Sequence, residues 1–208
     1  MNTVPAFCGY SFRQFSLPTG GTLRLYGSYT SPFVRHCRIA LDETGCKYEL
    51  VETDASASAK QSPTKRVPFL QDGDISLTDS TAIVKYLRER SGQPYLADIA
   101  EYDAFCLVNT SLDACVNVFF LERDGIHAAQ SPYLQRQSAR VNSTLAELNQ
   151  MSLPTQAPYG DMALRLACYL AWGLYRERIS LTDYPNLENF LHQINHYQPF
   201  SATAPPPL

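Results

Sequence analysis

Apolar positions with a period of two residues mark four short segments in the first half of the chain. Residues 23–27 alternate between apolar and more polar side chains, as in a strand with one face buried and the other exposed. Residues 48–53, 67–70 and 75–77 are short, apolar or alternating, and bounded by turn-forming residues. The four segments therefore predict four strands, the last two joined by a turn at residues 71–74.

Helical spacing fills the gaps around these strands. After the first strand, Ser31 occupies the N-cap position and Pro32 the first helical position, the favoured combination at a helix start. Gly45 ends that helix, since glycine readily adopts the left-handed conformation found there. A short helix precedes the third strand, and another helix begins at Thr81. The resulting order, β-α-β-α-β-β-α, predicts an α/β domain.

The pattern changes after Ser91-Gly92-Gln93-Pro94, a cluster of residues that break regular structure. Beyond it no strand pattern persists, and helices are predicted at about residues 97–122, 133–149, 160–176 and 186–197. The sequence thus divides into an N-terminal extension (1–22), an α/β domain (23–92) and an all-α domain (97–208).

Two places in the α/β domain carry backbone groups suited to an anionic peptide. A cis Val67-Pro68 bond at a strand entrance would turn the backbone groups of Val67 outward, toward a ligand. The Asp79-Ser80 pair opens the last helix of the domain, where free N–H groups attract a carboxylate. An ordinary β-hairpin followed by a capped helix has the same local sequence, so that alternative stays open from these residues alone.

At these places the chain resembles the cytosolic glutathione transferases, from about Leu23 to the C-terminus. The turn Ser31-Pro32-Phe33-Val34-Arg35, the entry Arg66-Val67-Pro68 and the Asp79-Ser80 pair follow in that family's order and at its distances. The C-terminal sequences at 183–187 and 205–207 look most like small bacterial members of the serine type. The resemblance implies a thioredoxin-like N-terminal domain, an all-helical C-terminal domain, glutathione as co-substrate and usually a homodimer.

The resemblance also implies a role for each matching residue in binding glutathione. Val67 would pair with the peptide backbone, and Pro68 would be the cis residue. Asp79 would bind the ammonium of the γ-glutamyl end, and Ser80 its carboxylate. Arg66 would pair with the glycyl carboxylate, and the alternative for Arg66 is a solvated loop charge.

Conjugation requires the glutathione thiol as thiolate, because the thiolate is the nucleophile. The resemblance implies that Ser31 donates the hydrogen bond that stabilises this thiolate, and without it a simple N-cap is the favoured role. Thr30 and Ser28 remain alternatives, because a shift of one or two residues in the turn would bring either to the sulfur. A serine forms no mixed disulfide with glutathione, so transfer to an electrophile is expected rather than thiol-disulfide exchange.

The electrophilic acceptor is expected between the domains, against the helix that starts near residue 97. Tyr102, Phe105 and Asn109 share one face of that helix, and Trp172 on a later helix could join them. Phe33 at the first helix start would lean on the peptide. For these residues the alternative is the hydrophobic core, and none of them identifies the acceptor.

Two further patterns predict no chemistry. Family members usually begin the third C-terminal helix with serine or threonine three residues before an aspartate; Pro158 precedes Asp161 here, which predicts loss of a cap worth about 1 kcal/mol. Glu188, His192 and His196 share a helix face, but the outer two would lie roughly 12 Å apart, too far for one ion. No metal is predicted.

Composition and charge limit the partners. Residues 23–92 carry ten Lys/Arg against nine Asp/Glu, whereas residues 93–208 carry six Arg against eleven Asp/Glu, which disfavours nucleic acid. Nowhere do 18 apolar residues follow one another, so no membrane span is expected. The six cysteines show no metal-ligand spacing and are expected to be free thiols in the cytoplasm.

Three functions fit this sequence. A glutathione transferase is favoured, because both the candidate thiol-activating serine and the Asp79-Ser80 pair are present. The alternatives are a non-catalytic protein-binding module similar to stringent starvation protein A, and a glutathione-dependent peroxidase or reductase.

Overall fold

Four strands form one mixed sheet in the order β2-β1-β3-β4. The computed structural model describes residues 22–207, so the predicted extension at 1–22 falls outside the described residues except for Thr22. The strands are β1 (Leu23–Gly27), β2 (Tyr48–Glu52), β3 (Phe69–Asp72) and β4 (Ile75–Leu77). β1 pairs in parallel with β2 and antiparallel with β3, which pairs antiparallel with β4.

The third strand differs from its prediction at both ends. It begins at Phe69 rather than at Val67, and it continues to Asp72, which the sequence had placed in the turn. Asp72 pairs with Ile75 in the sheet, and its fully buried carboxylate contacts Arg90 and accepts a hydrogen bond from Tyr86. These tertiary partners make a strand position favourable for an aspartate that local propensity assigns to a turn.

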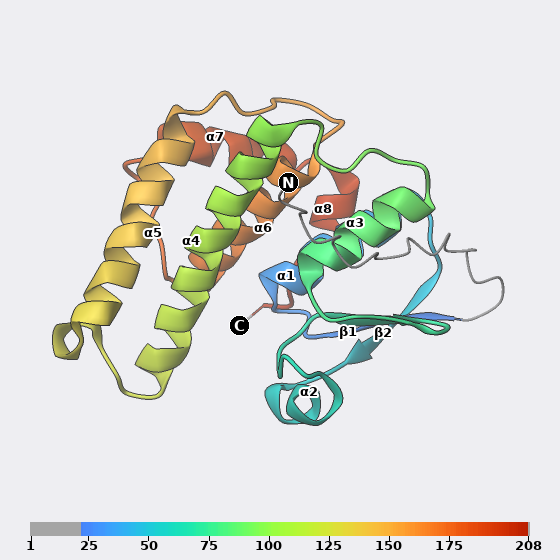
Figure 1. Ribbon diagram of the computed structural model, residues 1–208. Helices are drawn as coiled ribbons and strands as arrows, with labels where there is room; N and C mark the ends of the chain where they lie inside the picture. The colour runs from blue at the N-terminus through green and yellow to red at the C-terminus, as the bar shows by residue number, and fades with distance from the viewer. Residues whose placement is uncertain (1–21, 208) are drawn as a thin grey trace, which may run out of the picture.

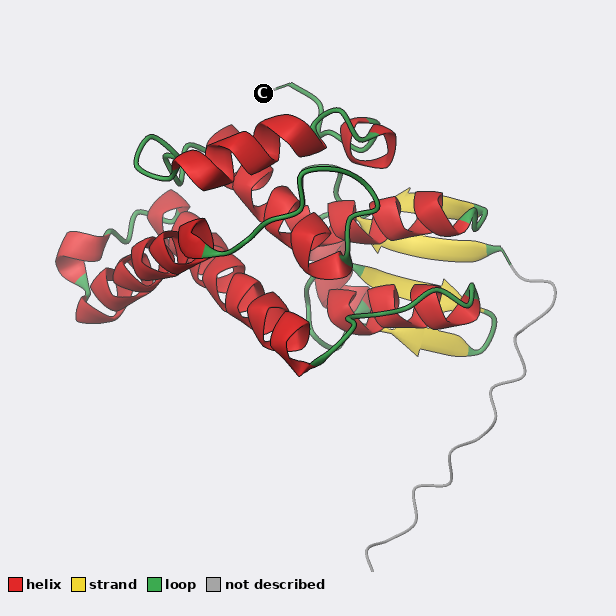
Figure 2. Cartoon of the chain, turned by 90° about the horizontal axis from the view of Figure 1, so that it is seen from above, coloured by secondary structure: helices red, strands yellow, loops and turns green. Residues whose placement is uncertain are grey.

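Helices α1 (Pro32–Thr44) and α3 (Ser80–Arg90) lie on one face of the sheet and α2 (Ala55–Gln61) on the other (Figure 1; Figure 2 gives the view from above). Ser31 caps α1, with Pro32 at its first turn, and Gly45 ends it with φ 65°. The predicted order β-α-β-α-β-β-α is therefore confirmed.

The second domain is helical, as predicted. Its elements are α4 (Ile99–Arg123), the short η1 (Ala128–Gln130), α5 (Pro132–Gln150), α6 (Asp161–Tyr175), α7 (Pro185–Ile194) and α8 (Gln198–Ser201). The predicted fourth helix ends earlier than expected, at Ile194, and α8 follows separately. Gly160 rather than Pro158 is the N-cap residue of α6, and no side chain caps this helix.

The long helix α4 is apolar enough, by length and composition, to span a membrane. This differs from the expectation drawn from uninterrupted apolar runs. α4 packs against α5 and α6, and Val108, Leu112 and Cys115 are buried in the core between them. A central core helix accounts for this composition without a membrane.

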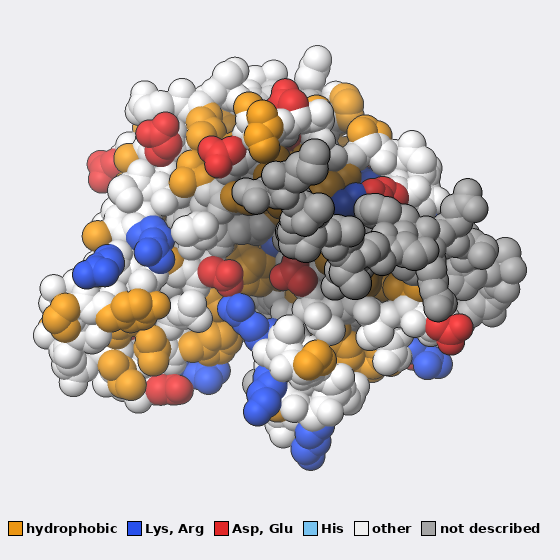
Figure 3. Space-filling view, in the orientation of Figure 1, with side chains coloured by type: hydrophobic (Ala, Val, Ile, Leu, Met, Phe, Trp, Pro, Cys, Tyr) orange, Lys and Arg blue, Asp and Glu red, His pale blue; other side chains and the backbone are white. Residues whose placement is uncertain are grey.

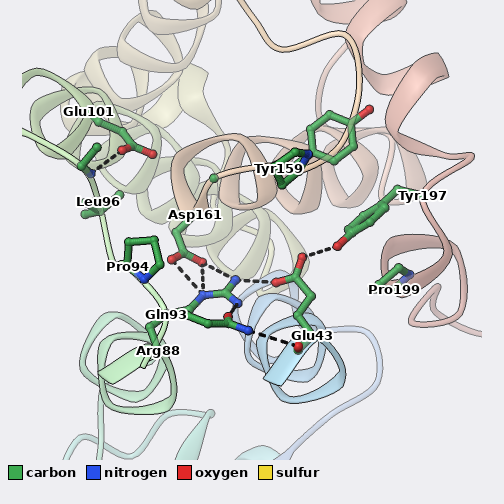
Figure 4. A pocket seen from close by; sticks show the side chains of 13 residues that line it. Glu43, Arg88, Gln93, Pro94, Leu96, Glu101, Tyr159, Asp161, Tyr197 and Pro199 are labelled. Carbon is green, nitrogen blue, oxygen red and sulfur yellow. Dashed lines mark hydrogen bonds and ion pairs between the residues drawn. The ribbon is translucent and has the colours of Figure 1, made fainter. Parts of the chain in front are cut away.

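A chain of buried polar side chains joins the two domains. Asp161, at the first position of α6, accepts hydrogen bonds from Arg88 of α3 at 2.8 to 3.2 Å and contacts Nε2 of His36 on α1 at 3.1 Å. Arg88 also pairs with Glu43 at 2.5 Å, and Glu43 accepts a hydrogen bond from Tyr197 (Figure 4). Breaking such a buried pair from one side leaves an uncompensated charge, so this chain holds the domains in register.

His36 is neutral in this chain, and its tautomer is determined. The Arg165 Nε donates to His36 Nδ1 at 3.0 Å, so Nδ1 carries no proton and Nε2–H donates to Asp161. Burial lowers the pKa of His36 to about 4, against the hydrogen bond to Asp161 that favours the charged form. Burial opposes the charge of Asp161, yet hydrogen bonds from His36 and Arg88 outweigh it and lower the pKa of this carboxyl to about 2.

We expect the free energy of unfolding to fall as the pH drops from about 6.5 toward 4. Over that range the unfolded chain binds a proton at His36 and the folded chain does not, which costs up to roughly 1.4 kcal/mol per pH unit. His36→Gln should remove that part of the slope, measured by urea unfolding across this pH range. The exposed His192→Gln is the matched control, and an equal flattening by both variants would contradict the assignment.

Candidate functional site

Three segments meet at one edge of the sheet. β1 and β4 end there and β3 begins there, because β3 runs antiparallel to both. The pairing of Tyr26 with Phe69 is the last one at this edge, so Val67 and the turn that follows β1 both lie just beyond it. α1 and α3 start at the same edge, so two helix N-termini and the strand entrance lie together. This arrangement gathers the residues that the sequence assigned to glutathione binding.

In the turn before α1, the three candidate hydroxyls have different hydrogen bonds. The Oγ of Ser31 accepts from the Val34 N–H at 3.3 Å, and its own proton has no acceptor among the described residues. Ser28 and Thr30 bond each other at 3.1 Å, and Ser28 Oγ also accepts from the Thr30 N–H. The pair uses one of its two protons internally, whereas the proton of Ser31 is free and this hydroxyl is the N-cap of α1.

Two buried cysteines lie close to this turn. Cys37 is in α1, and its thiol contacts the Ser80 carbonyl oxygen at 3.9 Å. Cys168 lines a small cavity of about 10 Å³ together with Ser31 and Trp172. Burial raises the pKa of Cys37 to about 12 and that of Cys168 to about 11, which makes both poor nucleophiles.

The Val67-Pro68 peptide bond is cis, as the resemblance implied. Val67 lies just before β3 and is half-buried. In the described part of the chain, neither its N–H nor its carbonyl oxygen forms a backbone hydrogen bond. Both groups are therefore available to an extended peptide, which is the geometry of strand addition.

The Asp79-Ser80 pair forms the N-terminus of α3. Asp79 Oδ1 accepts from the N–H groups of Thr81 and Ala82, at 2.7 and 3.4 Å, so this residue caps the helix. Asp79 remains exposed, whereas Ser80 is buried and its Oγ accepts from Arg165 at 3.0 Å. The sequence left a capped helix open as the alternative here, but it did not indicate the arginine behind Ser80.

Arg66 already has a partner. Its guanidinium forms an ion pair with Asp113 of α4 at 3.0 Å, and both side chains are about half exposed. Neither predicted alternative, a glycyl carboxylate or a freely solvated charge, describes this contact. Figure 3 shows the notch between the helical domain and the lobe that carries α2, with side chains of both charges at its walls.

The four predicted acceptor residues do not line one pocket. Phe105 is fully buried and packs edge-on against Tyr95, so its assignment to a pocket is wrong and the core alternative holds. Tyr102 is exposed and borders a cavity of about 610 Å³ that Asp79 also lines. Trp172 packs against Phe119 and reaches the small cavity at Ser31 instead.

Asn109, the fourth predicted acceptor residue, and Phe33, which was predicted to contact the peptide, lie in different surroundings. Asn109 is half-buried, and its Oδ1 has no partner among the described residues. Phe33 is partly buried and packs against the core of the helical domain, with the Arg165 guanidinium 5.2 Å from its ring centre. Phe33 thus packs against the hydrophobic core, which was its alternative.

A cavity of about 640 Å³ lies on the other side of α3, at the linker between the domains (Figure 4). Its floor is made by Arg88 and the two carboxylates that pair with it, Glu43 and Asp161. Proline and tyrosine side chains surround it: Pro94, Pro158, Tyr159, Tyr197 and Pro199. Because its charged groups already satisfy each other, the cavity offers little for a polar ligand.

Sequence reasoning missed His36 and Arg165 entirely. The available signal was Arg165 itself, the only charged residue between Met162 and Tyr175 in an apolar helix. A charge in such a stretch predicts a buried partner, because an exposed face would hold several polar residues.

Comparisons with known proteins agree with this geometry. Residues 25–95 match the family model described as the N-terminal domain of glutathione S-transferase. Glutathione S-transferase Z2 of Arabidopsis thaliana is 27% identical over 88% of this chain and 91% of its own length. A zeta-class enzyme of Euphorbia esula is 28% identical over 91% and 92%. A probable glutathione S-transferase of rice is 37% identical over 83 residues, only 39% of its length.

Solved structures have the same fold. A glutathione S-transferase from Methylobacterium radiotolerans, in complex with glutathione sulfonate, gives a TM-score of 0.78 at 24% identity, covering 89% of this chain and 95% of that one. One from Methylobacillus flagellatus, with glutathione bound, gives 0.77 at 23% identity, covering 89% and 100%. The chain therefore shares the thioredoxin-like N-terminal domain and the helical C-terminal domain of these structures, and its residues 25–95 are similar in sequence to the N-terminal domain of the glutathione transferases.

Proposed function

We propose that this protein is a glutathione transferase that joins the thiolate of glutathione to a small, hydrophobic electrophile. One observation carries the proposal: Ser31 has a free proton at the N-terminus of α1, at the same sheet edge as the unpaired backbone of Val67. The serine would donate to the thiolate while the peptide pairs with Val67 and its γ-glutamyl end reaches Asp79 and Ser80.

The energetics are modest and can be met by these groups. A free thiol has a pKa of about 8.5, and lowering it by two units requires roughly 2.7 kcal/mol of preferential anion stabilisation. One hydroxyl hydrogen bond and a helix N-terminus can supply that amount. Because nucleophilicity falls with the pKa, the net gain is only a few-fold, and positioning of the electrophile must provide most of the rate.

The remaining parts of the proposal rest on the family and on the surface. A second copy would cover Ile99 and Tyr102, which are 80% and 46% exposed on one face of α4 beside the Asp79 cavity. The cytoplasm is the proposed location, since the five cysteines of the described chain are free thiols. No metal is proposed to take part.

Ser31→Ala should raise the pKa of bound glutathione and reduce turnover, while the affinity for glutathione stays nearly unchanged. The fold should persist, because losing one N-cap costs about 1 kcal/mol. Ultraviolet titration of the bound thiolate measures the effect, and Thr30→Val is the matched control. Loss of the thiolate signal in the Thr30 variant alone would move the role to Thr30 and leave Ser31 as a cap.

Replacing Asp79 should separate its two roles. Asp79→Asn keeps a good N-cap acceptor for α3 but removes the negative charge that the ammonium needs. We expect calorimetry to show that glutathione binds roughly 30-fold more weakly, a loss of about 2 kcal/mol of binding free energy. The melting temperature should change little. An unchanged affinity would exclude Asp79 from the site. Wild type that fails to bind glutathione-agarose would favour a protein-binding module instead.

The dimer is tested by sedimentation at micromolar concentration. We expect about twice the 23.3 kDa of the chain. Ile99→Glu should shift the protein toward monomer, since it buries a charge in the proposed interface, whereas Ile126→Glu, at another exposed isoleucine, should not. A 23.3 kDa wild-type species would contradict the dimer.

A further inference from the structure

Arg165 is a fully buried cation without a carboxylate partner. It lies on α6 of the helical domain, and its Nε donates to neutral His36, its Nη1 to Ser80 Oγ. Its Nη2 is buried with no hydrogen-bond partner in the described chain. Arg88 differs, because it pairs with Asp161 and Glu43, and so does Arg66, which pairs with Asp113. Arg35 is also buried without a carboxylate, but it donates to Thr203 and to the Phe200 carbonyl and lies over the Phe200 ring. A buried charge of this kind is unfavourable until a negative group approaches it.

The bond from Arg165 determines what Ser80 can do. A guanidinium has donors only, so Ser80 Oγ must accept from it, and the single hydroxyl proton of Ser80 is left to donate elsewhere. No residue in the described part of the chain accepts that proton. The Ser80 N–H, in the first turn of α3, likewise has no backbone acceptor in the described chain, since Asp79 accepts from the N–H groups of Thr81 and Ala82 instead.

The surroundings therefore favour one small anion at the start of α3. Ser80 offers an O–H and an N–H, the helix N-terminus adds a positive partial charge, and Arg165 lies directly behind. Asp79, one residue earlier, would repel a carboxylate on its own. The uncompensated charge of Arg165 offsets that repulsion, so an ammonium and a carboxylate on the same carbon can bind side by side.

We propose that Arg165, in the second domain, is a positioning residue for glutathione. Its hydrogen bond leaves the Ser80 hydroxyl proton to donate to the α-carboxylate of the γ-glutamyl end, and its positive charge balances the negative charge of that carboxylate. This inference rests on the proposed function and deepens it, because it assigns the recognition of one carboxylate to a helix that the ligand does not touch.

Calorimetry with two ligands tests the proposal on the full-length protein. One ligand is glutathione; the other is γ-aminobutyryl-cysteinyl-glycine, which keeps the amine and the rest of the peptide but lacks the α-carboxylate. Arg165→Met should weaken glutathione binding at least tenfold and change the affinity for the analogue less than twofold. Arg176→Met, at the far end of the same helix, is the matched control and should affect neither ligand.

The outcomes are distinct. If Arg165→Met weakens both ligands equally, the arginine only supports the fold and the inference fails. If wild type binds neither ligand, the proposed function fails as well. Should Arg165→Met not fold, as judged by circular dichroism, Ser80→Ala replaces it and must show the same preference for losing glutathione over the analogue. Equal affinities of Ser80→Ala and wild type for glutathione would overturn the proposal.

Discussion

The placement of the two domains depends on the carboxylate of Asp161. It lies at the start of α6 and binds Arg88 of α3 and His36 of α1, the two helices on the same face of the sheet. α6 itself has no side-chain cap, because its N-cap residue is Gly160. The local cost, roughly a few tenths of a kcal/mol, is small beside the charge that would be stranded without Asp161.

The same interface sets the electrostatics of the candidate site. Asp161 already forms an ion pair with Arg88 and accepts a hydrogen bond from His36. No carboxylate in the described interface is therefore left for Arg165. The domain contact thus holds a positive charge behind Ser80 that neither domain would place there alone. The proposed binding would be coupled to domain packing, because the arginine that donates to Ser80 belongs to the second domain.

The local signals were reliable where one short segment decides its own conformation. Ser31-Pro32 starts α1 and Gly45 ends it, because an N-cap, a fixed φ and a left-handed glycine act within a few residues. The resemblance to the family added the cis bond at Pro68. Errors arose where a distant residue determines the outcome. Asp72 lies in a strand because its carboxylate contacts Arg90 and accepts a hydrogen bond from Tyr86. Phe105 is in the core, where it packs against the ring of Tyr95.

By itself, the sequence determined the order of strands and helices and the positions of the helix starts at Pro32 and Ser80, where the site is proposed. Periodicity and caps are properties of neighbouring residues, so one chain is enough to define them. Only the tertiary structure decided which polar groups stay free. The charge of Arg165 lacks a carboxylate because Asp161 already pairs with Arg88 and His36, and the contact between Arg165 and His36 joins residues 129 positions apart.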